Sequence, residues 1–398
     1  MDFKKDFPIL NSNITYLDNA ATTLKPVSVV NKISDYYLKY PANANRGDYD
    51  MARIVDDELN NVRQKVKEFI NASKKEEIIF TSGTTESLNI IIKGFFKDYL
   101  KSGDEILTTK AEHAALILPW FDIISKNGAQ IKYIDLNESY ELTLDNLKKA
   151  ITKKTKVISL SHITNVIGDV RPIKEIIDYA HKQGIIVLID GAQSVPHEKI
   201  DVRDLDVDFL TFSAHKMLGP TGVGVLYGKE KYLSKVKPLI LGGSMNASFD
   251  SLGNVVYKDL PWKLEAGTQN LSGILGFADA IDYINELGID NIHKYEVDLK
   301  KYAIGKLEKL DNLIIYNKDI ENGIITFNVK NVFAQDVSQY LNKKGICVRV
   351  GEHCAKILSE VLGVKNTVRV SFYFYNTKQD VDKLYDALNN DNILYDSL

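Results

Sequence analysis

The sequence is poor in cysteine. Only two cysteines, Cys347 and Cys354, occur among its 398 residues, too few for a disulfide framework or a cysteine-rich zinc site. No apolar run approaches the roughly 20 residues that a membrane helix needs, and the N-terminal residues lack the apolar stretch of a signal peptide. We therefore expect a cytoplasmic protein without a membrane span, with both thiols reduced.

The sequence also has no excess of positively charged residues, with 50 Lys and Arg against 53 Asp and Glu. The formal net charge is -3, so charge gives no reason to expect nucleic-acid binding. A hydrophobic content of 44% and a charged content of 26% are ordinary for a soluble globular protein. We find no internal repeat and no low-complexity tract. The length allows a large core and a second, smaller domain.

Strand-like and helical patterns alternate through the first two thirds of the chain. The strand-like segments are short and mostly apolar: Glu77–Thr81, Glu105–Thr108, Gln130–Ile134, Lys156–Leu160, Ile185–Asp190, Phe209–Phe212 and Val223–Tyr227. Helical patterns include a segment after Pro26, Asp50–Phe69, Thr85–Tyr99 and Ile173–Gln183. This alternation predicts an α/β fold with a mainly parallel sheet between helices.

The pattern changes after about residue 262. Two long helical patterns, Gly273–Glu286 and Ile289–Leu310, precede shorter strands and helices. This change predicts a smaller α+β domain. We place the large domain at 14–262 and the small domain at 263–398 together with 1–13.

The stretch Asp208–Gly219 places a lysine just beyond a core strand. Its first half alternates and is rich in aromatic and β-branched residues, which predicts a short buried strand leading to Lys216. Burial would disfavour the charged form of this amine and leave the nucleophile that a Schiff-base lysine needs. The competing interpretation is an ordinary loop lysine whose amine reaches solvent.

Other polar residues also follow predicted strands. Ligands of parallel sheets bind beyond the carboxyl ends of the strands. Thr84 and Thr85 offer hydroxyls and N–H groups at a helix N-terminus, a cradle for phosphate or an ordinary helix cap. Asp190 ends a buried strand, where a carboxylate needs a cationic partner such as a pyridinium, or else caps a helix or joins a salt bridge. His113 and Asn165 follow two further strands.

Together these motifs resemble the class V aminotransferase family of fold-type I pyridoxal phosphate (PLP) enzymes, and within it the cysteine desulfurases of the sulfur-mobilisation (Suf) type, group II. The motifs span most of the chain: Asp18–Ala21, Ser82–Glu86, Glu112–His113, Asp190–Gln193, Ser213–Lys216, Glu265–Thr268 and Arg349–Ala355. The resemblance implies a large domain with a seven-stranded type of sheet, and it implies PLP as cofactor.

The resemblance also implies roles for residues around the cofactor ring. Lys216 would hold PLP as a Schiff base and later move the Cα proton of the substrate. Asp190 would pair with the pyridinium nitrogen, Gln193 would hydrogen-bond the phenolate oxygen, and His113 would stack on the ring. No metal is implied.

The phosphate and the substrate would have their own residues. The resemblance assigns the phosphate to Thr84, Thr85, Ser213 and His215, with Thr268 contributed by the partner subunit of a homodimer that shares its active sites. The substrate L-cysteine would be held through its carboxylate by Arg369, assisted by Asn165 and with Arg349 nearby.

The resemblance to the cysteine desulfurases, as opposed to other members of the family, rests chiefly on Cys354. It follows the polar residues Gly351-Glu-His in a predicted exposed loop, whereas Cys347 alternates within a strand-like segment and is predicted to be structural. The resemblance implies that the Cys354 thiolate takes the sulfur of cysteine as a persulfide, releases alanine, and passes the sulfur to an acceptor protein for iron–sulfur cluster assembly. Positive charge from Arg349 or His353 would favour the thiolate.

Two departures and two alternatives stay open. Glu352 and Asn45 stand where the family often has histidine, and the effect of either change is not evident from the sequence. A selenocysteine lyase or a cysteine sulfinate desulfinase would share the whole scaffold. A non-catalytic assembly partner is disfavoured because Lys216 and Cys354 are both present.

Overall fold

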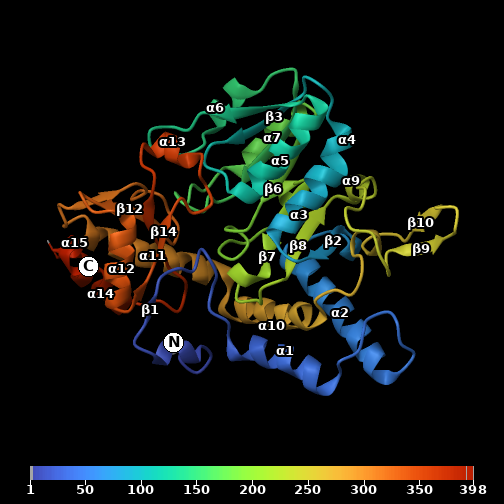
Figure 1. The fold of residues 1–398 in the computed structure, drawn as a ribbon, viewed down its shortest axis with the longest axis horizontal. Coiled ribbons are helices and arrows are strands. Elements are labelled where there is room, and N and C mark those ends of the chain that lie inside the picture. Colours follow the sequence, from blue (N-terminus) through green and yellow to red (C-terminus); the bar gives the residue numbers. More distant parts are fainter. Residues whose placement is uncertain (1–2, 391, 398) are drawn as a thin grey trace.

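A seven-stranded sheet forms the centre of the computed structural model, which describes residues 3–390 and 392–397 (Figure 1). Its strands are β2 (Ile78–Thr81), β3 (Glu105–Thr109), β4 (Gln130–Ile134), β5 (Thr155–Ser161), β6 (Ile186–Asp190), β7 (Phe209–Ser213) and β8 (Gly224–Gly228). Their order is β2-β8-β7-β6-β5-β3-β4, and β8 alone runs antiparallel to its neighbours. The predicted α/β fold with a mainly parallel sheet is confirmed.

Both faces of this sheet are covered by helices. Along β6, Val187 and Ile189 join one apolar core, whereas Ile186 and Leu188 join the other. This alternation places successive side chains on opposite faces. The helices that cover the sheet include α2 (Asp50–Phe69), α3 (Thr84–Ile91), α5 (Ala114–Asn127), α7 (Ile173–Lys182) and α10 (Leu271–Leu287), and α1 (Val27–Lys39) packs against α10. The cores show α2, α7 and α10 on one face and α3 and α5 on the other.

The predicted helix Thr85–Tyr99 is interrupted. Between α3 and the short α4 (Lys97–Tyr99), a π-helical segment spans Ile92–Phe96. Phe95 and Phe96, although adjacent, both contact Phe209 on the sheet, with ring centroids 5.7 and 5.8 Å away. Burying both rings against one residue explains the wider turn.

A second sheet of four antiparallel strands lies in the C-terminal part, shown in orange and red in Figure 1. In sheet order these strands are β11 (Leu313–Ile315), β12 (Ile324–Val329), β15 (Thr367–Ser371) and β14 (Arg349–Gly351). The main helices of this part are α11 (Ile289–Leu307), α12 (Ala334–Lys343) and α14 (Lys378–Leu388). The predicted smaller α+β unit is confirmed. No helix among residues 3–390 and 392–397 has the length and apolar character to span a membrane.

Shorter elements complete the described chain. They are β1 (Thr15–Tyr16), α6 (Leu144–Ala150), α8 (Val202–Leu205), α9 (Glu230–Leu233), β9 (Asn246–Phe249), β10 (Val255–Tyr257), β13 (Ile346–Cys347), α13 (Leu358–Leu362) and α15 (Ile393–Ser397). Contacts cross both predicted domain boundaries, because β1 pairs with β13 and α10 packs against α1 and α2. The division at residues 14 and 262 stays a prediction.

One ion-pair cluster supports the sheet at the edge opposite the strand ends discussed below. His181 at the end of α7 contacts Asp206 through Nδ1 at 3.0 Å and Asp208 through Nε2 at 2.9 Å. Lys229 pairs with the same two carboxylates. The hydrogen bond to Asp208 raises the pKa of His181, so its charged form is the one that the fold favours.

We expect this imidazole to make stability depend on pH. A raised folded-state pKa gives stabilisation that is complete below the unfolded value of about 6.5 and is lost as pH rises through the folded value. The Tm difference between wild type and His181→Gln should be largest near pH 6 and should shrink toward pH 9. The corresponding difference in the free energy of unfolding should stay within about 1 kcal/mol, because solvent screens the partly exposed ion pair. A difference that does not change with pH would contradict this prediction.

Candidate active site

A cavity opens where the parallel strands end. β5, β6 and β7 stop at Ser161, Asp190 and Ser213, and these residues line a cavity of about 230 Å³. Most of the predicted site residues line it: Thr84, Thr85, His113, Asn165, Asp190, Gln193, Ser213, His215, Lys216, Arg349 and Arg369. The structure therefore brings together residues that lie up to 285 positions apart (84 to 369).

Lys216 lies on the 3-10 turn Ala214–Lys216, directly after β7. Its side chain faces the cavity and is otherwise surrounded by protein. Burial lowers the pKa of Lys216 to about 8; the carboxylate of Asp190 opposes this shift, and Arg369 and Arg349 add to it. A neutral, nucleophilic amine is thus available close to physiological pH, as Schiff-base chemistry requires.

Asp190 lies buried at the end of β6. Its Oδ1 accepts a hydrogen bond from the N–H of Ala192 at 2.9 Å. Burial raises the pKa of Asp190 to about 6. A cation placed opposite would favour the carboxylate, which is what a protonated pyridine nitrogen provides.

A second end of the cavity suits an anion. The hydroxyl of Ser213 accepts from the N–H of Thr84 at 2.8 Å and shares a second hydrogen bond of 2.8 Å with the Thr84 hydroxyl, at the N-terminus of α3. Gly83 and Gly224 make this turn possible, since a Cβ on Gly224 would lie 2.3 Å from the Cα of Gly83. Thr85 and the His215 ring lie alongside. Helix N–H groups and hydroxyls are a suitable cradle for a phosphate.

His113 is the N-cap of α5. Its Nδ1 accepts from the N–H of Ala115 at 3.1 Å, which leaves the ring proton on Nε2. Burial lowers the pKa of His113 to about 4, and the positive charges of Lys216, Arg349 and Arg369 add to the shift. The ring is therefore neutral near pH 7 and free to pack against a flat ligand.

Two side-chain amides reach the cavity with an unsatisfied oxygen. Gln193 donates through Nε2 to the carbonyl of Ala20 at 2.8 Å, while its buried Oε1 has no partner among the described residues. Asn165 donates to the carbonyl of His353 at 2.8 Å, and its Oδ1 is likewise unsatisfied. Buried polar groups without partners are costly. A bound polar group would remove that cost here.

Arg369 on β15 is buried beside the cavity. Its Nη2 pairs with Asp18 at 3.1 Å and its Nη1 donates to the carbonyl of Asn165 at 2.7 Å. Its Nε has no partner among the described residues. Burial lowers the pKa of Arg369 to about 10, so it stays charged at neutral pH. Arg369 itself lines the cavity, and a guanidinium there suits a carboxylate ligand.

Cys354 lies on a tight loop beside the cavity. It is exposed, and its Sγ accepts from Arg349 Nη2 at 3.7 Å. Gly351, His353 and Cys354 all have positive φ angles, of 117°, 50° and 59°. Two hydrogen bonds tie the loop to the large sheet region, from Ala114 N–H to the carbonyl of Cys354 at 2.7 Å and from Asn165 to the carbonyl of His353.

His353 differs from its sequence-based interpretation. It is buried, and its Nε2 lies 2.9 Å from the hydroxyl of Thr367. Burial lowers the pKa of His353 to about 3, with Arg369 and Arg349 adding to the shift. Its ring is neutral near pH 7, so the suggestion that it supplies positive charge is wrong. The positive group that contacts Cys354 is Arg349.

Other predicted residues lie away from the cavity. Thr268 is exposed, and its hydroxyl accepts from Asn43 at 3.2 Å rather than reaching the cavity of its own chain. Asn45 is also exposed and donates its N–H to Asp56. Cys347 is half-buried on β13, and burial raises its pKa.

The sequence did not predict several polar groups beside the cavity. Lys25 donates to the carbonyl of His215 at 2.7 Å, and burial lowers the pKa of Lys25 to about 7. Arg171 binds Glu112 next to His113. Glu112 stands within a motif and could have been considered, but Lys25 and Arg171 lie outside the motifs, and only their long-range contacts reveal them.

Comparison with known proteins identifies the family. The family model described as Aminotransferase class-V matches residues 15–384. The chain belongs to this family. It is therefore a fold-type I enzyme that depends on PLP, and the cradle for a phosphate, the buried Asp190 and the buried amine of Lys216 fit that cofactor.

Similar proteins indicate which activity within the family this chain has. A probable cysteine desulfurase of Halalkalibacterium halodurans is 42% identical, over 97% of this chain and 96% of that protein. One of Staphylococcus epidermidis is 44% identical, over 96% and 94%. A crystal structure of the cysteine desulfurase CsdA from Escherichia coli has a TM-score of 0.92 at 35% identity, over 99% and 98%. The chain is thus a PLP-dependent enzyme of the cysteine desulfurase type.

We predict that attachment of PLP depends on pH through Lys216. In cofactor-free protein the attachment rate should rise through about pH 8, because only the neutral amine reacts. Arg349→Gln removes a positive charge that lowers the pKa of Lys216, so the midpoint should move upward by about half a unit. Stopped-flow absorbance of added PLP measures the rate. The exposed Lys356→Gln serves as control and should leave the midpoint unchanged; a downward shift in Arg349→Gln would refute the prediction.

Proposed function

We propose that the enzyme converts L-cysteine to L-alanine and holds the released sulfur as a persulfide on Cys354. The observation that carries this proposal is the position of the exposed Cys354 sulfur, 3.7 Å from Arg349 Nη2, because Arg349 itself lines the cavity that contains Lys216 and Arg369.

The cavity suits the two ends of cysteine. Arg369, which lines the cavity, would bind the substrate carboxylate, with the neighbouring Asn165 assisting. Lys216 would hold the cofactor and then move the Cα proton, which its position on the β7 turn and its lowered pKa favour. PLP, when bound, supplies an electron sink for the Cα carbanion. Asp190 would keep the ring nitrogen protonated, and the neutral His113 would pack on the ring.

The sulfur step balances without an external oxidant. The Cys354 thiolate attacks the substrate sulfur and forms the S–S bond, while the C–S bond breaks and its electron pair stays on the substrate Cβ. Protonation of that carbon gives the methyl group of alanine. Arg349 Nη2 donates to the Cys354 sulfur at 3.7 Å and would orient it toward the substrate.

The exposed loop also suits delivery of the sulfur. A persulfide on an exposed residue is accessible to a second protein, and we propose a sulfur-acceptor protein of the Suf type that serves iron–sulfur cluster assembly in the cytoplasm. Glu352 beside Cys354 is half-exposed and could face such a partner. Turnover measured separately on cysteine, selenocysteine and cysteine sulfinate would distinguish this function from the lyase and desulfinase activities.

We predict that Cys354→Ala retains the visible absorbance of bound PLP but loses the protein persulfide. Release of alanine from L-cysteine should fall by about a hundred-fold, because the acceptor nucleophile is gone. Mass spectrometry after exposure to L-cysteine locates the modified thiol, and an alanine assay gives the rate. Cys347→Ala is the matched control and should retain both the absorbance of bound PLP and the protein persulfide. Desulfuration at the wild-type rate by Cys354→Ala would exclude the proposed role.

We further propose a homodimer in which Thr268 contributes to the partner's phosphate site, since Thr268 is exposed and does not line its own cavity. Lys216→Ala and Thr268→Glu should each inactivate the homodimer. A mixed dimer, isolated through two affinity tags, should regain one intact site, with Lys216 from one subunit and Thr268 from the other. Activity near half that of wild type is expected; no recovery in the mixed dimer would rule out a shared site.

A further inference from the structure

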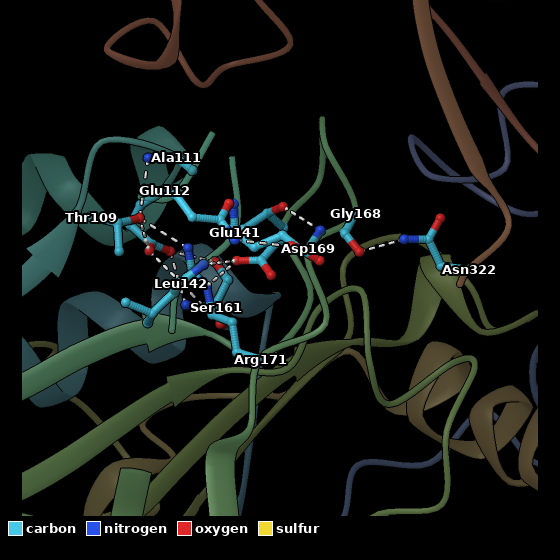
Figure 2. Close-up of polar contacts among 12 residues, drawn as sticks. Thr109, Ala111, Glu112, Glu141, Leu142, Ser161, Gly168, Asp169, Arg171 and Asn322 are labelled. Atoms are coloured by element: carbon cyan, nitrogen blue, oxygen red, sulfur yellow. Dashed lines mark hydrogen bonds and ion pairs between the residues drawn. The ribbon is translucent and has the colours of Figure 1, made fainter. Parts of the chain in front are cut away.

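A buried polar network (Figure 2) lies at the ends of β3 and β5, next to the cavity that Ser161 and His113 line. Arg171 is its centre and is 2% exposed. Its Nη1 donates to Glu112 at 2.5 Å and to the carbonyl of Ser161 at 3.0 Å, its Nη2 donates to the hydroxyl of Thr109 at 2.9 Å, and its Nε donates to Asp169 at 3.1 Å. The guanidinium therefore joins two strand ends and a loop.

Glu112 is equally well bound. Its Oε1 also accepts from the Thr109 hydroxyl at 2.7 Å, and its Oε2 accepts from the N–H and the hydroxyl of Ser161 at 2.8 and 2.7 Å. Asp169 accepts from the N–H of Leu142 at 3.0 Å. Two carboxylates thus share one guanidinium, and neutral donors satisfy the rest.

Such a network is a poor device for stability alone. Removing three charged groups from water is expensive, and well-packed apolar residues often replace buried ion pairs without loss of stability. What the network does is fix geometry, because each of its hydrogen bonds has one direction and one length. Its value therefore depends on what it holds in place.

It holds two segments that reach the cavity. Glu112 directly precedes His113, whose ring lines the cavity. Ser161 and Arg171 are the two ends of the loop that contains Asn165, and the N–H of Arg171 donates to the carbonyl of His162 at 3.0 Å. The carbonyl of Asn165 in turn accepts from Arg369.

The C-terminal unit binds the same loop from the other side. Three of its side chains donate to three consecutive loop carbonyls: Thr326 to Val166 at 2.5 Å, Asn317 to Ile167 at 2.7 Å, and Asn322 to Gly168. Figure 2 shows the last of these contacts beside the network. The loop is therefore clamped between the two sheets.

We propose that Arg171 and Glu112 are positioning residues of the active site: they set the ring of His113 and, through the loop that contains Asn165, the guanidinium of Arg369. Neither residue lines the cavity among the described residues, so they act through these neighbours. The inference rests on the proposed function for the roles of His113 and Arg369, and it assigns a purpose to two buried residues that the proposed chemistry does not use.

The charge of Glu112 also acts on the cavity. Asp190, whose pKa is raised chiefly by burial, is affected in the same direction by the Glu112 carboxylate. Glu112→Gln would therefore ease ionisation of Asp190. It would also disturb the geometry, because an amide NH2 would replace one of two oxygens that face donors, either those of Arg171 and Thr109 or those of Ser161.

The test uses purified holoenzyme and three variants, Arg171→Met, Glu112→Gln and Thr109→Val. The exposed Arg203→Met is the matched control. Circular dichroism of the bound cofactor reports how the ring is held, and steady-state kinetics with L-cysteine separates KM from kcat. We expect Arg171→Met and Glu112→Gln to keep PLP, to lose at least half of the cofactor dichroism, and to raise KM about ten-fold. Arg203→Met should match wild type.

The double variant Glu112→Gln/Arg171→Met distinguishes a unit from two independent residues. Because Glu112 and Arg171 act as one unit, the double variant should raise KM no more than the single variant with the larger effect does. Additive effects would overturn the proposal, as would cofactor dichroism and KM at wild-type values in either single variant.

Thr109→Val keeps all charges and removes only one hydroxyl, so it decides the matter if Arg171→Met does not fold. It should lower the dichroism and raise KM a few-fold in the same direction, and wild-type values would overturn the proposal. The dichroism does not depend on sulfur transfer. If Cys354 proved not to carry the persulfide, the cofactor dichroism would be unaffected. Failure of the proposed function can therefore be distinguished from failure of the positioning role of Arg171 and Glu112.

Discussion

The buried guanidinium of Arg369 joins three parts of the chain, and the geometry of the cavity depends on it. The residue stands on β15 of the smaller sheet, pairs with Asp18 near the N-terminus, and donates to the carbonyl of Asn165 beyond β5. A buried charge of this kind must keep its partners, because an unpaired one costs several kcal/mol. These contacts tie the smaller sheet to the N-terminal segment and to the loop beyond β5, and they fix the guanidinium beside the cavity.

Burial, with a smaller contribution from positive charge, explains the protonation state of the histidines that line the cavity. Burial, together with the neighbouring cations, lowers the pKa of His113 to about 4, of His215 to about 4 and of His353 to about 3. All three rings are neutral near pH 7, so they can pack against a ligand without adding charge. Of the basic groups that line the cavity, Lys216 is left with a pKa of about 8. The site thus combines cations for anionic ligand ends with one amine poised between its two protonation states.

The sequence predicted the elements that depend on local pattern. Gln130–Ile134 and Phe209–Phe212 were predicted as strands from their alternation and their aromatic and β-branched residues, and they match β4 and β7 within one residue. Lys216 and Asp190 could be found because each directly follows such a strand, and parallel strands end at one edge of a sheet. The ion pairs Arg369–Asp18 and Arg171–Glu112 could not be found, since the two partners lie 351 and 59 residues apart in the sequence. The neutral state of His353 depends on burial, which the polar sequence around it does not reveal.

The loop of Cys354 has a fixed backbone beside the cavity and an exposed sulfur. Consecutive residues with positive φ, His353 and Cys354, hold a tight turn that costs conformational energy, and such strain persists only where neighbouring contacts compensate for it. Here the compensation comes from hydrogen bonds between backbone carbonyls of the loop and Ala114 and Asn165. The backbone is therefore fixed beside the cavity while the sulfur itself stays exposed. The thiol of Cys354 is therefore positioned both by this backbone and by its 3.7 Å contact with Arg349, which lines the cavity.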